Sequence, residues 1–471
     1  MAGEQRPAGE QRAAAERRLM AERRLVAAVI ARNAAAVRAC LEEGADPDTR
    51  GPDGLPLLCL AVAGFDHATA EALTDADPGA DPGADPDREL PDGTTPLLRA
   101  VDLGSTALVE AVLGKDPALR IPAPARQRLL DLARRRYETG EEEELRRRTG
   151  ADGPAVRRRV RDGDHAQAEE VAPGGHAVRA GHGSVLTLLE QRFGVLPPVA
   201  EVVARGIRRP DDDDAWFTAA HALAGRRSER ARSELASLRH HPDPVRRLFL
   251  AEVLWHRVLL AGAVMDGSDS TRDVGMLAAW AFDEPDGRVL GRVLAALLGR
   301  RHPAGETLGL RHADHPDPRV RREVPYLLSP ELTGPGEAAT AALLVLADDP
   351  DGAVRASVAD ALETPGVFAP DVREALLRLL RDSDLAVRAR AAATLAGSGD
   401  RTAAVTEALA ALLDEEHRTL RLEAAYALAR RDDPRTEDAY ARVGPLGPGF
   451  EHDHRVSAHW QYRWRNRPGG H

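Results

Sequence analysis

A five-residue motif, Asp-x-x-Val-Arg, returns at a nearly constant interval near the C-terminal end of the chain. Its apolar position falls at residues 320, 354, 387 and 420, so the steps are 34, 33 and 33 residues. A period of this length is typical of stacked supersecondary units and not of one globular core. It therefore directs the search for function to an extended recognition surface instead of a catalytic pocket. The charged positions of the copies are Asp317 and Arg321, Asp351 and Arg355, Asp384 and Arg388, and Arg421, which ends a copy that begins with His417.

The composition predicts that these units are helical. The chain has 471 residues, which is too many for one ordinary hydrophobic core. Aromatic residues make up only 4%, so the core must be built mainly from Ala, Leu and Val, which suits closely packed helices. The formal net charge of -11 argues against a whole-chain role in binding nucleic acid or an anionic membrane. We expect an all-α tandem solenoid.

The repeated motif lies among predicted helix pairs. Residues 371–380 and 402–413 carry apolar residues at helical spacing. Between them, Asp384 is placed to cap a second helix that has Val387 and Leu395 on one face. This region resembles HEAT repeats, particularly the short form found in phycobilisome-lyase-like proteins. Because weaker copies of the motif lie upstream, the HEAT-like region is predicted over residues 216–440.

The resemblance to HEAT repeats also implies a role for the motif. In that family the Asp and Arg of the motif pair with the next repeat and form a ladder. Carried over to this chain, the motif aspartates would pair with the motif arginines or with their neighbours. The fourth copy departs from this pattern because it has His417 at the acidic position. The ladder residues implied are Asp317, Arg321, Asp351, Arg355, Asp384, Arg388 and Arg421.

A second repeat lies near the N-terminus. The sequence Gly-Ala-Asp-Pro-Asp at 44–48 returns at 83–87, and each copy leads through an Asp-Gly pair to an apolar helical run. Thr95 and Pro96 are expected to start a helix, with Thr as its cap and Pro in its first turn. This segment resembles an ankyrin repeat array of about three repeats, which we place over residues 19–120.

The remaining segments are predicted to be less regular. Residues 1–18 are expected to form a disordered tail, and residues 441–471 an irregular C-terminal tail. Residues 121–215 are expected to form a helical connector that is broken near Gly140 and contains a polar loop over 157–183. The chain contains no apolar run that is typical of a secretory signal or a transmembrane helix, so a cytoplasmic protein is expected.

No motif in the chain predicts catalysis. The sequence lacks a P-loop, a dinucleotide fingerprint and a nucleophile elbow, so we expect no enzyme activity and no cofactor. His165, His176 and His182 match no zinc-ligand spacing, and a solvated loop is favoured over a metal site. Cys40 and Cys59 lie in apolar helical stretches, and buried thiols are favoured over a disulfide or a metal site.

Two runs of charge have structural interpretations. The four carboxylates at 211–214 lack the spacing of a calcium loop, so a charged helix N-terminus is favoured. The glutamates at 141–144 precede the arginines at 146–148, which predicts paired and solvated charges on one helix.

The arginines of the motif leave two functional hypotheses open. They recur at the repeat period, so they line one edge of the solenoid. The favoured interpretation is the structural ladder, in a non-enzymatic scaffold that binds protein partners through solenoid surfaces. The alternative is a basic groove for phosphates, as in HEAT-like alkylpurine DNA glycosylases, in a nucleic-acid-binding or base-repair protein. A third hypothesis, a chromophore lyase, rests on fold analogy alone.

Overall fold

The structure is a computed structural model with two compact units, Met1–His256 (unit 1) and Arg257–His471 (unit 2). The residues that it describes are 8–75, 83–150, 154–164, 166–172, 176–209, 213–263, 267–299, 302–329, 335–447, 449–450 and 453–466. These residues are mostly helical, with one small sheet in unit 1, so the predicted all-α repeat solenoid is confirmed. Within these ranges, no helix has both the length and the apolar character needed to span a membrane.

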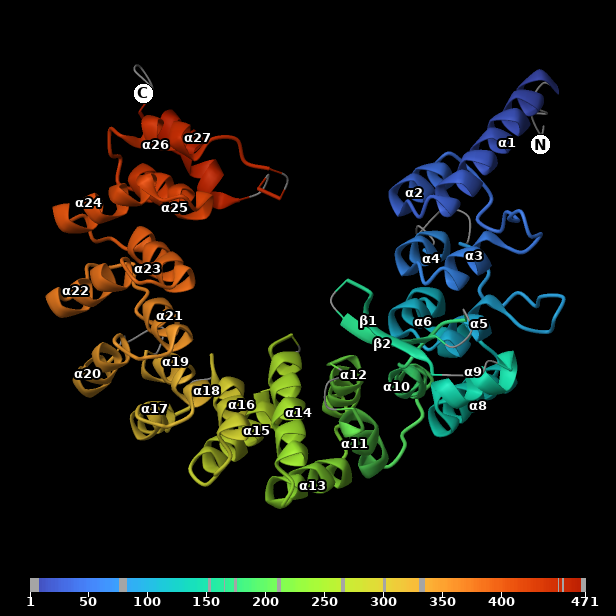
Figure 1. The fold of residues 1–471 in the computed structure, drawn as a ribbon, viewed down its shortest axis with the longest axis horizontal. Helices are drawn as coiled ribbons and strands as arrows, with labels where there is room; N and C mark the ends of the chain where they lie inside the picture. The colour runs from blue at the N-terminus through green and yellow to red at the C-terminus, as the bar shows by residue number, and fades with distance from the viewer. Residues whose placement is uncertain are drawn as a thin grey trace, which may run out of the picture. The chain divides into compact units, whose positions relative to one another are not determined.

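Unit 1 begins with three helix pairs. The first helices of the pairs pack on one another, and so do the second helices, which produces two layers. Figure 1 shows α2, α4 and α6 along one side of this stack and α3 and α5 along the other. The pairs are α1 (Ala8–Ile30) with α2 (Ala34–Glu42), α3 (Leu57–Ala63) with α4 (His67–Thr74), and α5 (Pro96–Leu103) with α6 (Thr106–Leu113).

The turns between these pairs follow the predicted chemistry. Gly54 and Gly93, each preceded by Asp, have φ angles of 77° and 76°, a region that favours glycine because it lacks a Cβ. Thr95 Oγ1 accepts a hydrogen bond from the Leu98 N–H at 3.1 Å and caps α5. Pro96 occupies the first turn of α5, so the predicted start of this helix is confirmed.

The rest of unit 1 combines helices with a short antiparallel sheet in the order β1–β2–β3. The register of β1 on β2 runs from Val156 opposite Ala172 to Asp162 opposite Ala166. The elements are α7 (Pro117–Arg120), α8 (Ala123–Thr139), α9 (Glu141–Thr149), β1 (Val156–Asp162), β2 (Ala166–Ala172), β3 (Val178–Arg179), α10 (His182–Arg192), α11 (Val199–Ile207), α12 (Asp213–Ala224), α13 (Glu229–Ser237), η1 (Leu238–His240) and α14 (Pro244–Ala263), which ends in unit 2.

This sheet corrects the predicted polar loop over 157–183. A strand is usually recognised by alternating apolar and polar residues, and β1 has almost no apolar residues. Its arginines instead face glutamates of β2. Arg157 Nη1 donates to Glu169 Oε2 at 2.7 Å, and Arg158 Nε donates to Glu170 Oε1 at 2.5 Å. Opposite charges across a strand pair stabilise the ladder without an apolar stripe.

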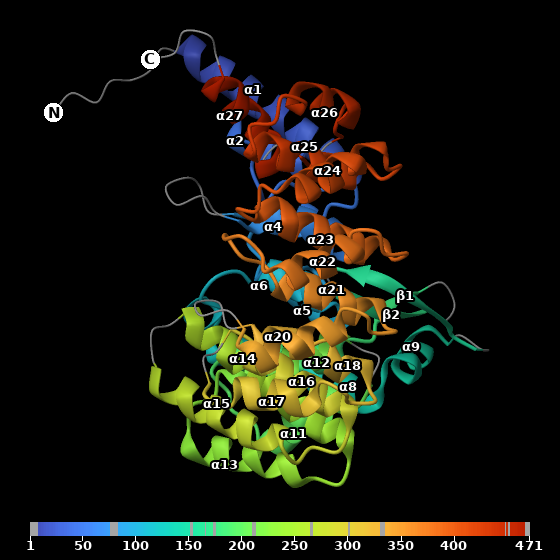
Figure 2. The ribbon, with the colours of Figure 1, turned by 90° about the vertical axis from the view of Figure 1, so that its left-hand side faces the viewer.

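Unit 2 is a stack of helix pairs (Figure 2). Each pair packs on the next mainly through its second helix, as in the contacts of α21 with α23 and of α23 with α25. The elements are α15 (Gly267–Ala281), α16 (Gly287–Leu297), α17 (Gly305–His312), α18 (Pro318–Arg321), α19 (Val324–Leu328), α20 (Glu337–Leu346), α21 (Gly352–Ala361), α22 (Pro370–Leu379), α23 (Leu385–Gly397), α24 (Ala403–Ala411), η2 (Leu412–Asp414), α25 (Arg418–Arg430), α26 (Thr436–Val443) and α27 (His454–Arg465).

The core of unit 2 is built from small and aliphatic side chains. Val387, Ala391 and Leu395 have no exposed area and lie on the apolar face predicted for α23. In unit 1, Cys40 and Cys59 are buried free thiols, as predicted. Burial raises the pKa of the Cys59 thiol.

Both predicted tails contain helices. α1 begins at Ala8, so the tail predicted to be disordered over 1–18 is helical from that residue onward. The C-terminal stretch predicted to be irregular over 441–471 contains α27, which packs on α25. Ala458 is buried, whereas aromatic and charged residues cover the rest of α27, so no apolar period reveals it in the sequence.

Candidate interaction surfaces

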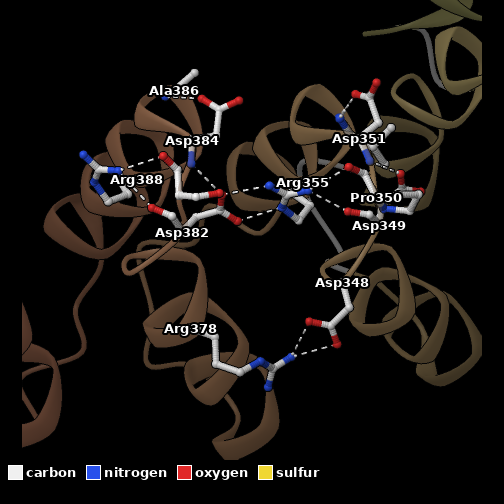
Figure 3. Close-up of polar contacts among 12 residues, drawn as sticks. Asp348, Asp349, Pro350, Asp351, Arg355, Arg378, Asp382, Asp384, Ala386 and Arg388 are labelled. Atoms are coloured by element: carbon white, nitrogen blue, oxygen red, sulfur yellow. Dashed lines mark hydrogen bonds and ion pairs between the residues drawn. The ribbon is translucent and has the colours of Figure 1, made fainter.

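Arg355 links two consecutive helix pairs of unit 2 (Figure 3). Its Nε and Nη2 atoms donate to Oδ2 and Oδ1 of Asp382, at 2.7 and 2.8 Å. Its Nη1 atom donates to the carbonyl oxygens of Asp349 and Pro350, at 2.7 and 3.3 Å. One guanidinium therefore fixes the turn of its own repeat and binds the acid of the next. Only 16% of the Arg355 side chain and 11% of the Asp382 side chain are exposed, so water screens the pair weakly.

The same link recurs in the repeat before and, more weakly, in the repeat after. Arg321 donates from Nε and Nη2 to Asp349, at 2.7 and 2.9 Å. Arg388 Nη2 lies 3.5 Å from Glu415 Oε2, which is a single longer contact. A ladder thus connects consecutive helix pairs of unit 2 through their arginines, and its last rung here is its loosest.

Two carboxylates of the ladder, Asp349 and Asp382, are held in the ionised form. The hydrogen bond from Arg355 is the largest influence on Asp382 and lowers the pKa of that carboxyl below its ordinary value. Burial by itself would raise the pKa of Asp349, but hydrogen bonding and the charge of Arg321 outweigh burial and lower it. Both rungs are therefore charge-assisted, which makes their hydrogen bonds stronger than neutral ones.

The acid of the ladder is not the acid of the motif, which corrects the pairing expected from the HEAT resemblance. Asp317, Asp351 and Asp384 cap α18, α21 and α23, each accepting from the N–H two residues later. The acids that pair with arginine lie two residues before the caps, at Asp349 and Asp382. A capping carboxylate is held against its own helix, so the earlier acid is left to meet the preceding repeat.

The capping aspartates have a second role at the junction of repeats. A Cβ on Gly352 would come within 2.5 Å of Asp384 Oδ2, so the cap of one repeat lies directly against the helix start of the repeat before it. A Cβ at this position would force the capping carboxylate of Asp384 to shift, so the close approach favours glycine. The predicted cap of α23 by Asp384 is confirmed.

Arg421, the last arginine of the motif, contacts carbonyl oxygens of its own turn and no carboxylate of another repeat among the residues described. Arg421 Nη1 donates to the carbonyl oxygens of Glu415 and Glu416, at 2.7 and 2.8 Å, and no carboxylate pairs with it among the residues described. The other ladder arginines direct their donors to carboxylates and carbonyls of the protein itself. This use of donors counts against a phosphate-binding edge.

A groove runs along the second-helix layer of unit 1. Its volume is about 1230 Å³. It is lined by His67, Glu71 and Thr74 of α4 and by Ala107 and Glu110 of α6. The turns before α3 and α5 and the tip of the β1–β2 hairpin complete the lining. The groove therefore extends across successive helix pairs, which is the form of surface expected of a repeat array.

Carboxylates outnumber basic side chains in this groove. Arg18 pairs with Asp46 at 3.0 Å and Arg192 with Glu110 at 2.8 Å, but the described residues provide no arginine or lysine partner for Glu71. The surplus favours a positively charged partner segment. The lining acids are Asp46, Asp48, Glu71, Asp75, Asp85, Glu110 and Asp164, and the lining bases other than histidine are Arg18, Arg88, Lys115, Arg120 and Arg192.

The hairpin is anchored to the helix stack by Asp162. Its carboxylate, 5% exposed, accepts from Ser105 Oγ at 2.5 Å and from the Thr106 N–H at 3.1 Å. Both donors lie at the start of α6, where the helix dipole favours negative charge. The anchor places Asp164 at the hairpin tip, 3.6 Å from His67 Nε2. The segment predicted to be a loop thus contributes Gly163 and Asp164 to the lining of the groove.

The histidines of that segment do not form a site. His182 is 1% exposed, and its Nε2 lies 3.1 Å from the Asp102 carbonyl oxygen, so the solvated loop predicted for it is wrong. His176 is exposed, and His165 lies outside the described residues. Within the described ranges, no group of three or more His, Cys, Asp or Glu side chains is placed to hold a metal ion.

The two charge runs are partly as predicted. α12 begins at Asp213 within the acidic run, whereas residues 211 and 212 lie outside the described ranges. Residues 141–149 form α9 after the predicted break at Gly140, but Glu141 and Glu144 are buried and not solvated. Glu144 accepts from two arginines of the run, including Arg148 Nε at 2.9 Å.

Comparison with known families supports the C-terminal repeats. A family model of HEAT repeats matches residues 340–429, from α20 to α25. The predicted HEAT repeats at the C-terminal end are therefore confirmed for this part of the chain. No curated protein matches the chain.

One copy of the motif was not recognised from the sequence. Asp453 caps α27 by accepting from the Arg455 N–H at 2.9 Å, and Val456 takes the apolar position 36 residues after Leu420. Arg455 Nη1 also donates to Glu423 Oε2 of α25 at 3.0 Å. The signal was present as Asp-x-x-Val, but the interval is longer and serine replaces the final arginine.

A further inter-repeat pair was also missed. Arg373 Nε of α22 donates to Asp400 Oδ2 at 2.7 Å, and Asp400 is fully buried. The two residues are 27 apart in sequence, the same separation as Arg355 and Asp382. An arginine that is followed 27 residues later by an acidic residue therefore indicates an ion pair between consecutive repeats.

Proposed function

We propose that this chain is a non-enzymatic scaffold that binds protein partners through its solenoid surfaces, with the groove of unit 1 as its principal binding surface. The observation that carries the proposal is that groove, with a volume of about 1230 Å³ across successive helix pairs. We also propose that residues 19–120 form ankyrin-like repeats. The HEAT repeats of unit 2 belong to a fold that commonly presents protein-binding surfaces.

The charges of the groove support a partner with a basic segment. Glu71, Asp75 and Asp85 lie in the lining and have no arginine or lysine partner among the residues described. Carboxylates without an internal basic partner can pair with lysine or arginine of another chain, and such complementarity speeds encounter and selects partners. Because these contacts would lie in water, we expect the affinity to fall as salt is raised.

Charge reversal in the groove tests the proposal. The full chain carrying Glu71→Lys and Asp85→Lys would be used as bait beside the wild type. A matched control carries Glu229→Lys and Glu374→Lys, two exposed acids outside the groove. Quantitative mass spectrometry should find at least one partner retained by the wild type and the control but lost from the groove variant. Equal recovery of every partner by all three baits would contradict the proposal.

A further inference from the structure

The last helix of unit 2 carries an exposed pair of tryptophans. Trp460 and Trp464 lie one turn apart on α27, and their rings are stacked with centroids 5.6 Å apart. The two residues are 63% and 60% exposed, although tryptophan is highly buried on average in folded proteins. Two large aromatic side chains exposed side by side are typical of an interaction site, whereas single exposed apolar residues are common.

The tryptophans occupy positions that the earlier repeats bury. In α21, α23 and α25, the residues 7 and 11 positions after the N-cap are apolar and at most 6% exposed. Counted in the same way from Asp453, the N-cap of α27, these positions are Trp460 and Trp464. α27 therefore keeps the apolar positions of a repeat helix without the packing that covers them. The buried residues at these positions are Val358, Leu362, Ala391, Leu395, Ala424 and Leu428.

The tryptophans lie on the outer side of α27. The helix packs on α25, and Ala458 is its buried residue. Trp460 follows Ala458 by two residues, which is about 200° around the helix. Figure 1 shows α27 as the last helix at this end of unit 2. Terminal repeats of an array normally have a polar outer face, so an aromatic outer face indicates that a further helix packs there.

A hollow beside the tryptophans carries positive charge. It lies between α25 and α27 and has a volume of about 520 Å³. Gln461 lines the hollow, and Trp464 lies one turn after Gln461 on the same helix. The one carboxylate of the lining, Asp432, is already paired with Arg465, at 3.0 Å between Oδ1 and Nη2. Apart from His454, the charged lining residues are Arg401, Arg430, Asp432 and Arg465.

Two arginines of this hollow have no carboxylate partner among the residues described. Arg401 donates from Nη2 and Nη1 to the carbonyl oxygens of Arg430 and Arg431, at 3.1 and 3.3 Å. Arg430 donates from Nη1 to the Tyr426 hydroxyl at 3.1 Å. Both arginines are exposed, so their charges favour an acidic partner.

We propose that the outer face of α27 binds an acidic amphipathic helix of a partner protein. The apolar side of that helix would cover Trp460 and Trp464, as a further repeat helix would, and its carboxylates would pair with Arg401 and Arg430. Tryptophan, tyrosine and arginine contribute most of the binding energy at protein interfaces. The inference rests on the proposed scaffold function, to which it adds a partner of opposite charge, and it does not depend on the groove of unit 1.

The charges count against two other occupants. A second copy of this chain on the same face would bring arginines of the two copies together, and like charges in an interface are costly. Two arginines without carboxylate partners are also few for a nucleic acid, whose affinity depends on many phosphate contacts.

Selection from a displayed peptide library tests this proposal. The probe is a library of random peptides of about 16 residues, which is long enough for about four helical turns. The full-length wild type is the target, and a variant with Trp460→Ser and Arg430→Gln serves for counter-selection. A matched control carries Val345→Ser and Arg381→Gln, an exposed apolar residue and an exposed arginine elsewhere in unit 2. We expect the enriched peptides to be acidic, with apolar residues at helical spacing.

Anisotropy titrations of the enriched peptides give the decisive comparison. The variant of Trp460 and Arg430 should raise the Kd about tenfold or more, whereas the matched control should bind like the wild type. The groove variant with Glu71→Lys and Asp85→Lys should also bind these peptides like the wild type, so failure of the groove proposal would not change this result. Melting temperatures should agree among the proteins, because the substituted side chains are exposed.

Three results would overturn the proposal. The first is that no enriched peptide depends on Trp460 and Arg430, or that the peptides that do are basic. The second is a dimer in sedimentation that the variant of these two residues abolishes, which would identify a second copy as the occupant. The third is binding of a single-stranded oligothymidylate that the same variant abolishes, which would identify a nucleic acid.

Discussion

Breaking the Arg355–Asp382 pair should uncouple two HEAT repeats by an amount that the geometry predicts. The pair has two charge-assisted hydrogen bonds, at 2.7 and 2.8 Å, between side chains that are at most 16% exposed. Exposed pairs contribute about 0.2–1 kcal/mol, whereas loss of one partner of a fully buried pair costs about 3–5 kcal/mol. For this partly screened pair we expect a coupling energy of about 2 kcal/mol.

The Arg388–Glu415 pair is the matched comparison one repeat later. Its single contact is 3.5 Å long, and the Glu415 side chain is 32% exposed. We therefore expect a coupling energy of only about 0.5 kcal/mol. Arg355 and Arg388 donate in the same way to the carbonyls of their own turns, so those contributions cancel within each cycle.

Two double-mutant cycles measure the difference, with alanine at each of the four positions. Urea unfolding of the full chain gives the global effect. Repeat arrays depart from two-state behaviour, so native-state hydrogen exchange at α21, α23 and α25 should supply the local opening free energies. A coupling for Arg355–Asp382 that does not exceed the coupling for Arg388–Glu415 would refute the geometric reasoning.

Three further predictions concern stability. Gly352→Ala should destabilise unit 2 by about 1–3 kcal/mol in urea unfolding, because the new Cβ would lie 2.5 Å from Asp384 Oδ2. Gly275→Ala, in a helix with no atom within 4 Å of the new Cβ, should instead stabilise it by up to about 1 kcal/mol, and equal effects would exclude the close contact as the cause. The pKa of Asp382 is lower in the folded protein than its value of 3.8 in the unfolded chain. The ionised carboxylate therefore stabilises the fold fully above pH 3.8, and this stability is lost as the pH falls through the folded pKa. Urea midpoints should therefore drop below pH 4, and Asp382→Asn should flatten this drop; an unchanged slope would count against the pair. Asp162→Ala removes the anchor of the hairpin, so the opening free energy measured by hydrogen exchange should fall by about 1–3 kcal/mol in β1, in β2 and in the first turn of α6. Unchanged protection would show that other contacts hold the hairpin.

Periodicity and local chemistry made much of the fold predictable. The recurrence of the motif located the repeats, and the capping preferences of Asp384 and Thr95 located the starts of α23 and α5. These features depend on neighbours within a few residues, so one sequence suffices to identify them.

Contacts between distant segments were harder to predict. Asp382 and Asp384 are two nearby aspartates, and only Asp382 pairs with the arginine of the preceding repeat. The difference arises because the carboxylate of Asp384 already caps the N-terminus of α23. The hairpin was missed because its strands are held by Arg–Glu pairs and by Asp162, which meets α6 more than 50 residues away in sequence.

Hydrogen exchange of the full chain with and without its captured partner tests the scaffold most directly. Partner binding in the groove should slow exchange in α4, in α6 and in the turn at 83–90. The turns that hold Arg355 and Arg388 should be unaffected, because their donors are directed to the protein's own repeats. Protection confined to those ladder turns, with no change along the groove, would contradict the assignment of the groove as the principal binding surface.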